Sequence, residues 1–97
     1  MARAGYSYPL AGDWSVDEIK TVVKLYNCVE KTYEGGIDGR DLLAAYAGFK
    51  TVVNAKSQEK QLSREFQKVS GYSIYQAVKV ARNNPSKKVR LMENGHK

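Results

Sequence analysis

Apolar side chains recur every three or four residues in four separate stretches of the chain, which is the spacing of one face of an α-helix. The predicted helices lie near residues 16–34, 39–54, 58–69 and 74–83. Short polar or glycine-containing connections separate them. The pattern therefore predicts an all-α fold in which four short helices form a compact array.

Capping signals sharpen the helix boundaries. Ser15 with Glu18 forms the capping-box pattern, and Ser73 with Gln76 repeats it. Gly71 is expected to end the third helix in a left-handed conformation, which glycine adopts without a Cβ clash. The four predicted caps are Ser15, Asp38, Ser57 and Ser73.

Both ends of the chain lack a helical period. Within residues 1–13, Tyr6, Tyr8 and Leu10 alternate with Ser7 and Pro9, so we expect an extended arm that lays its rings on the helices. An exposed tyrosine-rich binding arm is the alternative. Residues 84–97 are polar and basic, and we expect them to form a frayed, flexible tail. A single helical domain is thus predicted over residues 1–83.

Length and charge narrow the class of protein. A chain of 97 residues makes one domain. Half of the net charge of +6 lies in residues 84–97, so the predicted folded part is only mildly basic and need not be a nucleic-acid surface. There is no apolar run long enough for a secretory signal or a membrane span, and we therefore expect a cytoplasmic protein that does not contact membranes.

Candidate chemistry is sparse, and no enzyme is predicted. The single histidine, His96, lies next to the end of the expected tail, where it could not be held against a substrate. Cys28 falls among apolar positions and is expected to be a small packing residue. Glu30 and Glu34 are four residues apart but have no histidine within reach, so neither a metal site nor a cofactor is predicted.

The stretch 66–81 is the one part of the sequence whose shape hints at an activity. A helix, a short turn containing Gly71 and a second helix form the pattern of a helix-turn-helix unit. In that reading Gln76 could contact adenine, while Lys79 and Arg82 could meet phosphates. A plain structural corner, or a corner that binds a protein partner, gives the same pattern. The candidate surface comprises Tyr75, Gln76, Lys79, Arg82 and, from the tail, Lys87 and Lys88.

Several short motifs resemble those of a known family. They are YSYPL, DWS, CVEKTYEGGI, LLAAYAGFK, KSQEKQL, EF and SGYSIY, which together span about residues 6–82. This combination resembles the YktA-like proteins, an uncharacterised family of small proteins from low-GC Gram-positive bacteria. The resemblance implies a helical domain, and it carries over no functional residues because the family has no assigned activity.

The leading functional hypothesis is a small non-enzymatic interaction module that binds another protein or itself. Abundant tyrosine, a thinly apolar third helix and the absence of catalytic residue sets favour it. The alternative is a nucleic-acid-associated protein that uses the corner at 66–81 and the basic tail.

Overall fold

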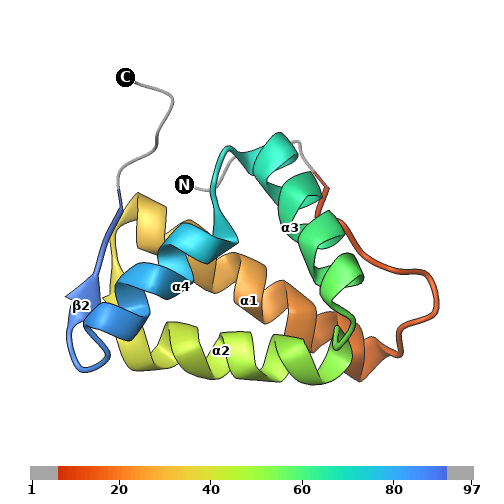
Figure 1. The fold of residues 1–97 in the computed structure, drawn as a ribbon, viewed down its shortest axis with the longest axis horizontal. Helices are drawn as coiled ribbons and strands as arrows, with labels where there is room; N and C mark the ends of the chain where they lie inside the picture. Colours follow the sequence, from red (N-terminus) through yellow and green to blue (C-terminus); the bar gives the residue numbers. More distant parts are fainter. Residues whose placement is uncertain (1–6, 92–97) are drawn as a thin grey trace.

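The computed structural model describes residues 7–91 and confirms the all-α fold, with four helices and one minimal two-stranded sheet (Figure 1). Predicted and observed bounds agree for the first and last helices, whereas the second ends earlier and the third starts earlier than predicted. The elements are α1 (Val16–Glu34), β1 (Ile37–Asp38), α2 (Gly39–Val52), α3 (Lys56–Ser70), α4 (Ile74–Asn83) and β2 (Lys88–Val89).

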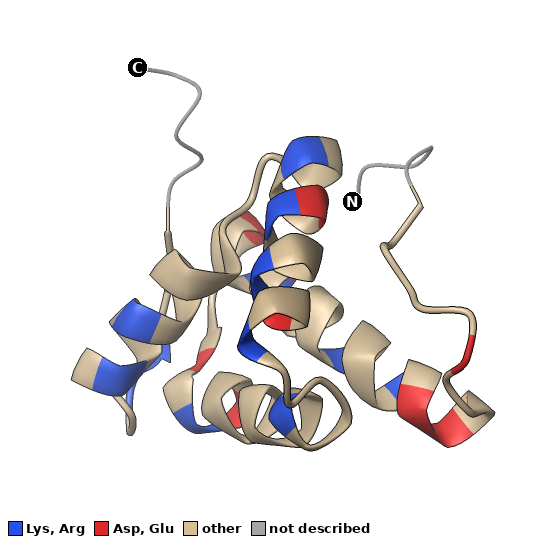
Figure 2. Ribbon diagram, turned by 45° about the vertical axis from the view of Figure 1, so that its right-hand side comes forward, with Lys and Arg blue, Asp and Glu red and all other residues tan. Residues whose placement is uncertain are grey.

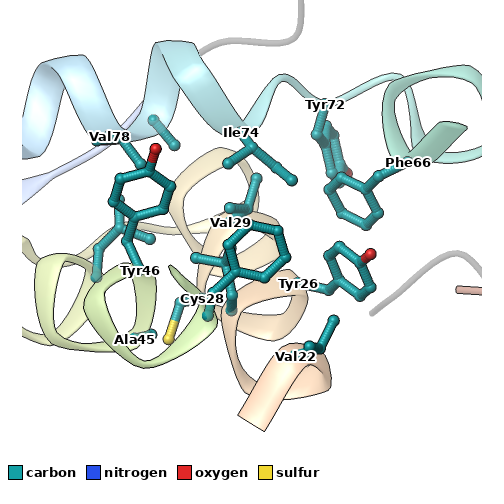
Figure 3. Close-up of a cluster of buried hydrophobic side chains, with 14 of the residues drawn as sticks. Val22, Tyr26, Cys28, Val29, Ala45, Tyr46, Phe66, Tyr72, Ile74 and Val78 are labelled. Atoms are coloured by element: carbon teal, nitrogen blue, oxygen red, sulfur yellow. The ribbon is translucent and has the colours of Figure 1, made fainter. Parts of the chain in front are cut away.

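The helices surround a core to which α1 and α2 supply half of the buried apolar side chains. α4 lies over the first part of α2, and α3 begins directly after α2 ends and rises away from it (Figure 1). α3 contributes only Leu62 and Phe66 as large buried apolar side chains. The largest fully buried side chains are Tyr26, Phe49, Phe66, Leu25, Leu42 and Ile74. Figure 3 shows Tyr26, Phe66 and Ile74 within this core.

Three of the four predicted caps are confirmed. Ser15 and Glu18 form the complete capping box at the start of α1. The Ser73 hydroxyl accepts from the Gln76 N–H at 3.2 Å, and Asp38 accepts from the Arg40 N–H at 2.9 Å. These bonds satisfy backbone donors that have no partner within the helix.

The boundaries of α3 differ in part from the prediction. Ser57 does not cap this helix, which starts at Lys56 after Ala55 and has no side-chain cap. At its end Gly71 has φ 81°, the left-handed conformation that the sequence predicted. Without a capping side chain the sequence carries no clear signal for the start of α3, and the predicted start is therefore too late.

The arm packs against the helices over its described part, residues 7–13. The Tyr8 ring lies 5.2 Å from Tyr26 and 6.2 Å from Phe66, measured between centroids. The Tyr26 hydroxyl donates to the Pro9 carbonyl at 2.8 Å. The expectation that the arm lays an aromatic ring on the helices is confirmed for Tyr8; residues 1–6 lie outside the described part.

Residues 84–91 correct the domain boundary expected at residue 83, because they are packed rather than frayed. β2 pairs antiparallel with β1, placing Val89 opposite Ile37, and Val89 is only 3% exposed. The Leu91 N–H donates to the Thr32 carbonyl at 2.8 Å. Val89 and Leu91 alternate with basic residues, which is a short strand pattern. Residues 92–97 of the expected tail lie outside the described residues.

Gly39 is required where the C-terminal segment docks on α2. A Cβ at this position would lie 2.6 Å from the Asn84 carbonyl oxygen and 3.2 Å from the Pro85 Cα. Both are backbone atoms, so no side-chain rotation relieves the clash. The Gly39 N–H also donates to the Lys87 carbonyl at 2.9 Å.

Gly39→Ala should therefore lower the free energy of unfolding by about 1–3 kcal/mol, the usual cost of overpacking. Urea unfolding followed by circular dichroism measures the change. Gly12→Ala is the matched control, because a Cβ there meets nothing within 4 Å, and it should stay within about 0.5 kcal/mol of the parent protein. Equal stability of the two variants would show that residues 84–87 do not dock closely on α2.

Candidate partner-binding surface

A buried carboxylate joins α3 to its neighbours. Glu59 lies in the first turn of α3 and is only 4% exposed. The Tyr46 hydroxyl of α2 donates to its Oε2 atom at 2.5 Å. Burial and the neighbouring Glu59 charge raise the pKa of Tyr75, which approaches the same carboxylate from α4. Glu59 therefore sits where α2, α3 and α4 meet.

Tyrosine hydroxyls also hold two carboxylates of α1. Tyr8 of the arm donates to Glu30 at 2.8 Å, and Tyr72, in the turn before α4, donates to Glu34 at 2.9 Å. Burial and then the hydrogen bond to glutamate raise the pKa of Tyr8, and the same two causes act on Tyr46. Tyrosine hydroxyls thus donate to the buried Glu30 and Glu59 and to the exposed Glu34.

Basic side chains surround the Tyr46 ring. The Lys50 ammonium lies 5.5 Å from the ring centroid, and the Arg82 guanidinium lies 5.8 Å from it, both within cation–π range. On α4, Tyr75, Lys79 and Arg82 recur with the spacing of a single helix side. This side of α4 adjoins the Tyr46–Glu59 hydrogen bond.

A groove of about 290 Å³ lies between α3 and α4. No carboxylate lines it. Within the described part of the chain, none of its four α3 side chains has a side-chain hydrogen bond or an ion pair. The lining residues are Lys60, Ser63, Arg64, Gln67 and Tyr75.

The groove and the basic residues beside it form one surface, which we call the cationic face. Figure 2 shows basic positions repeated along α3 and α4, and acidic positions both at the start of α1 and on α3. Two carboxylates of α3 lie near the cationic face. Glu59 is buried and accepts from Tyr46, and Glu65, which follows Arg64 in the chain, is exposed and accepts from Gln61. The cationic face comprises Lys50, Lys60, Arg64, Lys79 and Arg82, with Tyr75 at the groove.

The structure separates the residues that the sequence had grouped. Tyr75, Lys79 and Arg82 lie together on the cationic face, and Gln76 is exposed on the next side of α4. Lys87 and Lys88 are exposed beyond the end of α4 that is farther from Tyr75.

The basic and polar residues contributed by α3 were missed. A signal for them exists, because Lys56, Lys60, Arg64 and Lys68 recur every fourth residue, so that neighbours in this series lie one turn apart on the helix.

The beginning of α4, which would read bases in a helix-turn-helix protein, is partly covered. Ile74 is 1% exposed. The Ser73 N–H donates to the Tyr33 hydroxyl at 3.2 Å, and the Tyr33 ring stacks on Tyr72 at 4.6 Å between centroids. Ile74 therefore serves packing, and Gln76 and Lys79 are the exposed polar residues nearest this end.

The remaining candidate groups offer little chemistry. Cys28 is buried, and burial raises the pKa of its thiol, which disfavours the reactive thiolate. Residues 7–91 contain no group of three or more His, Cys, Asp or Glu side chains placed to hold a metal. His96 lies outside the described residues. None of the described helices is long and apolar enough to span a membrane.

The raised tyrosine pKa values predict a loss of stability at alkaline pH. Burial raises the pKa of Tyr26 as well as those of Tyr8 and Tyr46. The unfolded chain loses these protons near pH 10, whereas the folded domain retains them. Their contribution to stability is therefore complete below pH 10 and falls as the pH rises further.

A titration that follows tyrosinate absorbance and helical circular dichroism together tests this expectation. These three tyrosines should ionise only as helical signal is lost. Ionisation of all tyrosines near pH 10 with the helices intact would contradict it.

Tyr46→Phe keeps the aromatic ring and removes the donor to Glu59. We expect the free energy of unfolding to fall by about 1–3 kcal/mol, because a buried acceptor loses its hydrogen bond. Adding Glu59→Gln should recover part of this loss, since an uncharged amide is less costly to bury than a carboxylate. Denaturant unfolding of both variants measures the effect, and an unchanged midpoint for Tyr46→Phe would refute the role given to this hydrogen bond.

Comparison with known proteins identifies the family. Residues 5–90 match the Uncharacterised protein family (UPF0223). A UPF0223 protein of Streptococcus pneumoniae (strain CGSP14) is 49% identical over 86 residues, covering 89% of this chain and 94% of the relative. A UPF0223 protein of Streptococcus thermophilus (strain CNRZ 1066) is 51% identical over 82 residues, covering 84% of this chain and 88% of the relative. These matches confirm the resemblance seen in the sequence, and the chain belongs to the uncharacterised protein family UPF0223.

Proposed function

We propose that the protein is a small non-enzymatic interaction module that binds an acidic segment of another protein through its cationic face. One observation carries the proposal. Lys60 and Arg64 line a groove that no carboxylate lines, and neither has an ion-pair partner within residues 7–91. Positive charge without a partner in a concave surface favours a ligand of opposite charge.

The spacing of these cations suits a peptide. Lys60 and Arg64 are one helical turn apart, about 6 Å along the axis of α3. Carboxylates four residues apart on an acidic helix have the same spacing, and an extended acidic segment offers a similar separation between alternate side chains. Tyr46 and Glu59 fix α3 against its neighbours, so the groove is formed before a ligand arrives, which lowers the entropic cost of binding.

The distribution of positive charge favours a protein ligand over a nucleic acid. Lys87 and Lys88 lie at the other end of α4 from the groove, so the basic residues do not form one continuous track for a phosphate backbone. The beginning of α4, which would enter a major groove, is also partly covered, because Ile74 is buried and the Ser73 N–H donates to Tyr33. A nucleic-acid-associated protein is the alternative.

Fluorescence anisotropy with a labelled peptide rich in Glu and Asp tests the proposal on the full chain. Lys60→Glu combined with Arg64→Glu should weaken binding at least tenfold, because two attractive contacts become repulsive. Lys20→Glu with Lys24→Glu is the matched control: both lysines are exposed on α1 at the same spacing, and the net charge changes equally. The affinity of this control variant for the peptide should fall by no more than about threefold, which is the part of the effect due to net charge alone.

Equal losses in the two double variants would reduce the binding to a net-charge effect and overturn the proposal. The same measurement with a single-stranded oligonucleotide of equal charge tests the nucleic-acid alternative. That alternative would be established if the oligonucleotide bound more tightly than the peptide and if the Lys60→Glu, Arg64→Glu variant no longer bound it. Sedimentation of the protein alone tests self-association, in which Asp13, Asp17 and Glu18 of a second copy would occupy the cationic face.

A further inference from the structure

We propose that the groove between α3 and α4 binds a phosphoryl group, carried by a phosphorylated serine or threonine of the protein partner. This inference rests on the proposed function and names the chemistry that the groove selects. It follows from one buried hydroxyl, from the donors beside it, and from the absence of carboxylates in the lining.

Ser63 is the buried hydroxyl. It is only 5% exposed, and no hydrogen bond to its side chain is found within the described residues. Other buried hydroxyls in the helices bond back to the carbonyl four residues earlier, as Thr32 does at 2.9 Å and Ser70 at 2.6 Å. Ser63 departs from this behaviour, so its hydroxyl is not taken up by the backbone of its own helix.

The Ser63 hydroxyl oxygen is not fully shielded from solvent. Among the described residues, every side-chain nitrogen or oxygen that is fully shielded from solvent has a hydrogen-bond partner. The Ser63 oxygen has none, so some of its surface must be open, and the groove is the cavity that Ser63 lines. It is therefore a donor at the depth of the groove and available to a ligand.

The neighbouring side chains add donors of the kind that a phosphoryl group requires. Lys60, Arg64 and Gln67 flank Ser63 on α3 and supply an ammonium, a guanidinium and an amide. A phosphoryl dianion has three acceptor oxygens arranged tetrahedrally, so it can accept from several of these donors together. A planar carboxylate has two oxygens and satisfies fewer of them.

The groove has no negative charge in its wall on the α4 side. Tyr75 forms the wall on the α4 side. Behind it, the Glu59 carboxylate is buried and accepts from Tyr46, whose ring lies close to Lys50 and Arg82. The volume of about 290 Å³ is at the small end for ligand sites, which suits one phosphorylated side chain.

Two labelled peptides of one acidic sequence test this inference, one with phosphoserine and one with glutamate at the central position. The full-length protein should bind the phosphoserine peptide about tenfold more tightly, because charge-assisted hydrogen bonds are gained. Ser63→Ala should remove most of this preference, so that the ratio of the two affinities falls toward one. Ser57→Ala, at an exposed position on the same helix, is the matched control and should preserve the preference.

Arg64→Gln supplies a second variant, at an exposed position, and should also abolish the preference. Circular dichroism of each variant shows that the helices are intact. Inorganic phosphate should displace the phosphoserine peptide more effectively than chloride at equal ionic strength.

Each remaining outcome separates this inference from the proposed function. Equal binding of the two peptides, with both lost in the Lys60→Glu, Arg64→Glu variant, would overturn the phosphoryl site and leave the acidic-partner module standing. Binding of neither peptide would overturn both. If a 5′-phosphorylated oligonucleotide instead bound more tightly than the phosphoserine peptide and lost this affinity in Ser63→Ala, the phosphoryl site would stand. The assignment to a phosphorylated protein would then be overturned.

Discussion

The hydrogen bond from Tyr46 to Glu59 is the contact on which the arrangement of α3 depends. This helix has two large buried apolar side chains, Leu62 and Phe66, and no side-chain cap at its start. Phe66 attaches its middle to α1 by stacking on Tyr26 at 4.6 Å between ring centroids. Glu59 attaches its first turn to α2, so the two contacts together fix the direction of the helix and with it one wall of the groove.

The use of tyrosine as the donor to Glu59 leaves the neighbouring basic side chains at the surface. A buried carboxylate needs a partner, and lysine or arginine would satisfy the charge. At Glu59 the donor is Tyr46 instead, and no ion pair to Glu59 is found within the described residues. Lys50 and Arg82 lie against the Tyr46 ring and are not used to neutralise this carboxylate, so they contribute to the cationic face.

The elements that could be predicted from the sequence are those with local signals. The bounds of α1 follow from its capping box and its regular apolar stripe, and the bounds of α4 from Ser73 and the residues before Pro85. α3 was placed less well because its start carries no cap and its apolar face is thin. The packing of residues 84–91 was not predicted, because Val89 is buried by residues far away in the chain. The two-residue strand was also hard to recognise, because basic residues flank Val89 and make the segment look like a solvated tail.

The candidate surface was only half predictable, for a related reason. Helix periodicity places Tyr75, Lys79 and Arg82 on one side of α4, but it does not say what lies opposite them. That depends on the angle between α3 and α4, which Gly71 allows and the contacts of Glu59 and Phe66 decide. Ser63 is the clearest case. In the sequence it is one more polar residue on a polar helix, and only the packed structure shows that it is a buried donor lining the groove. A site assembled between two helices is therefore a property of their packing, which a reading of each helix alone does not contain.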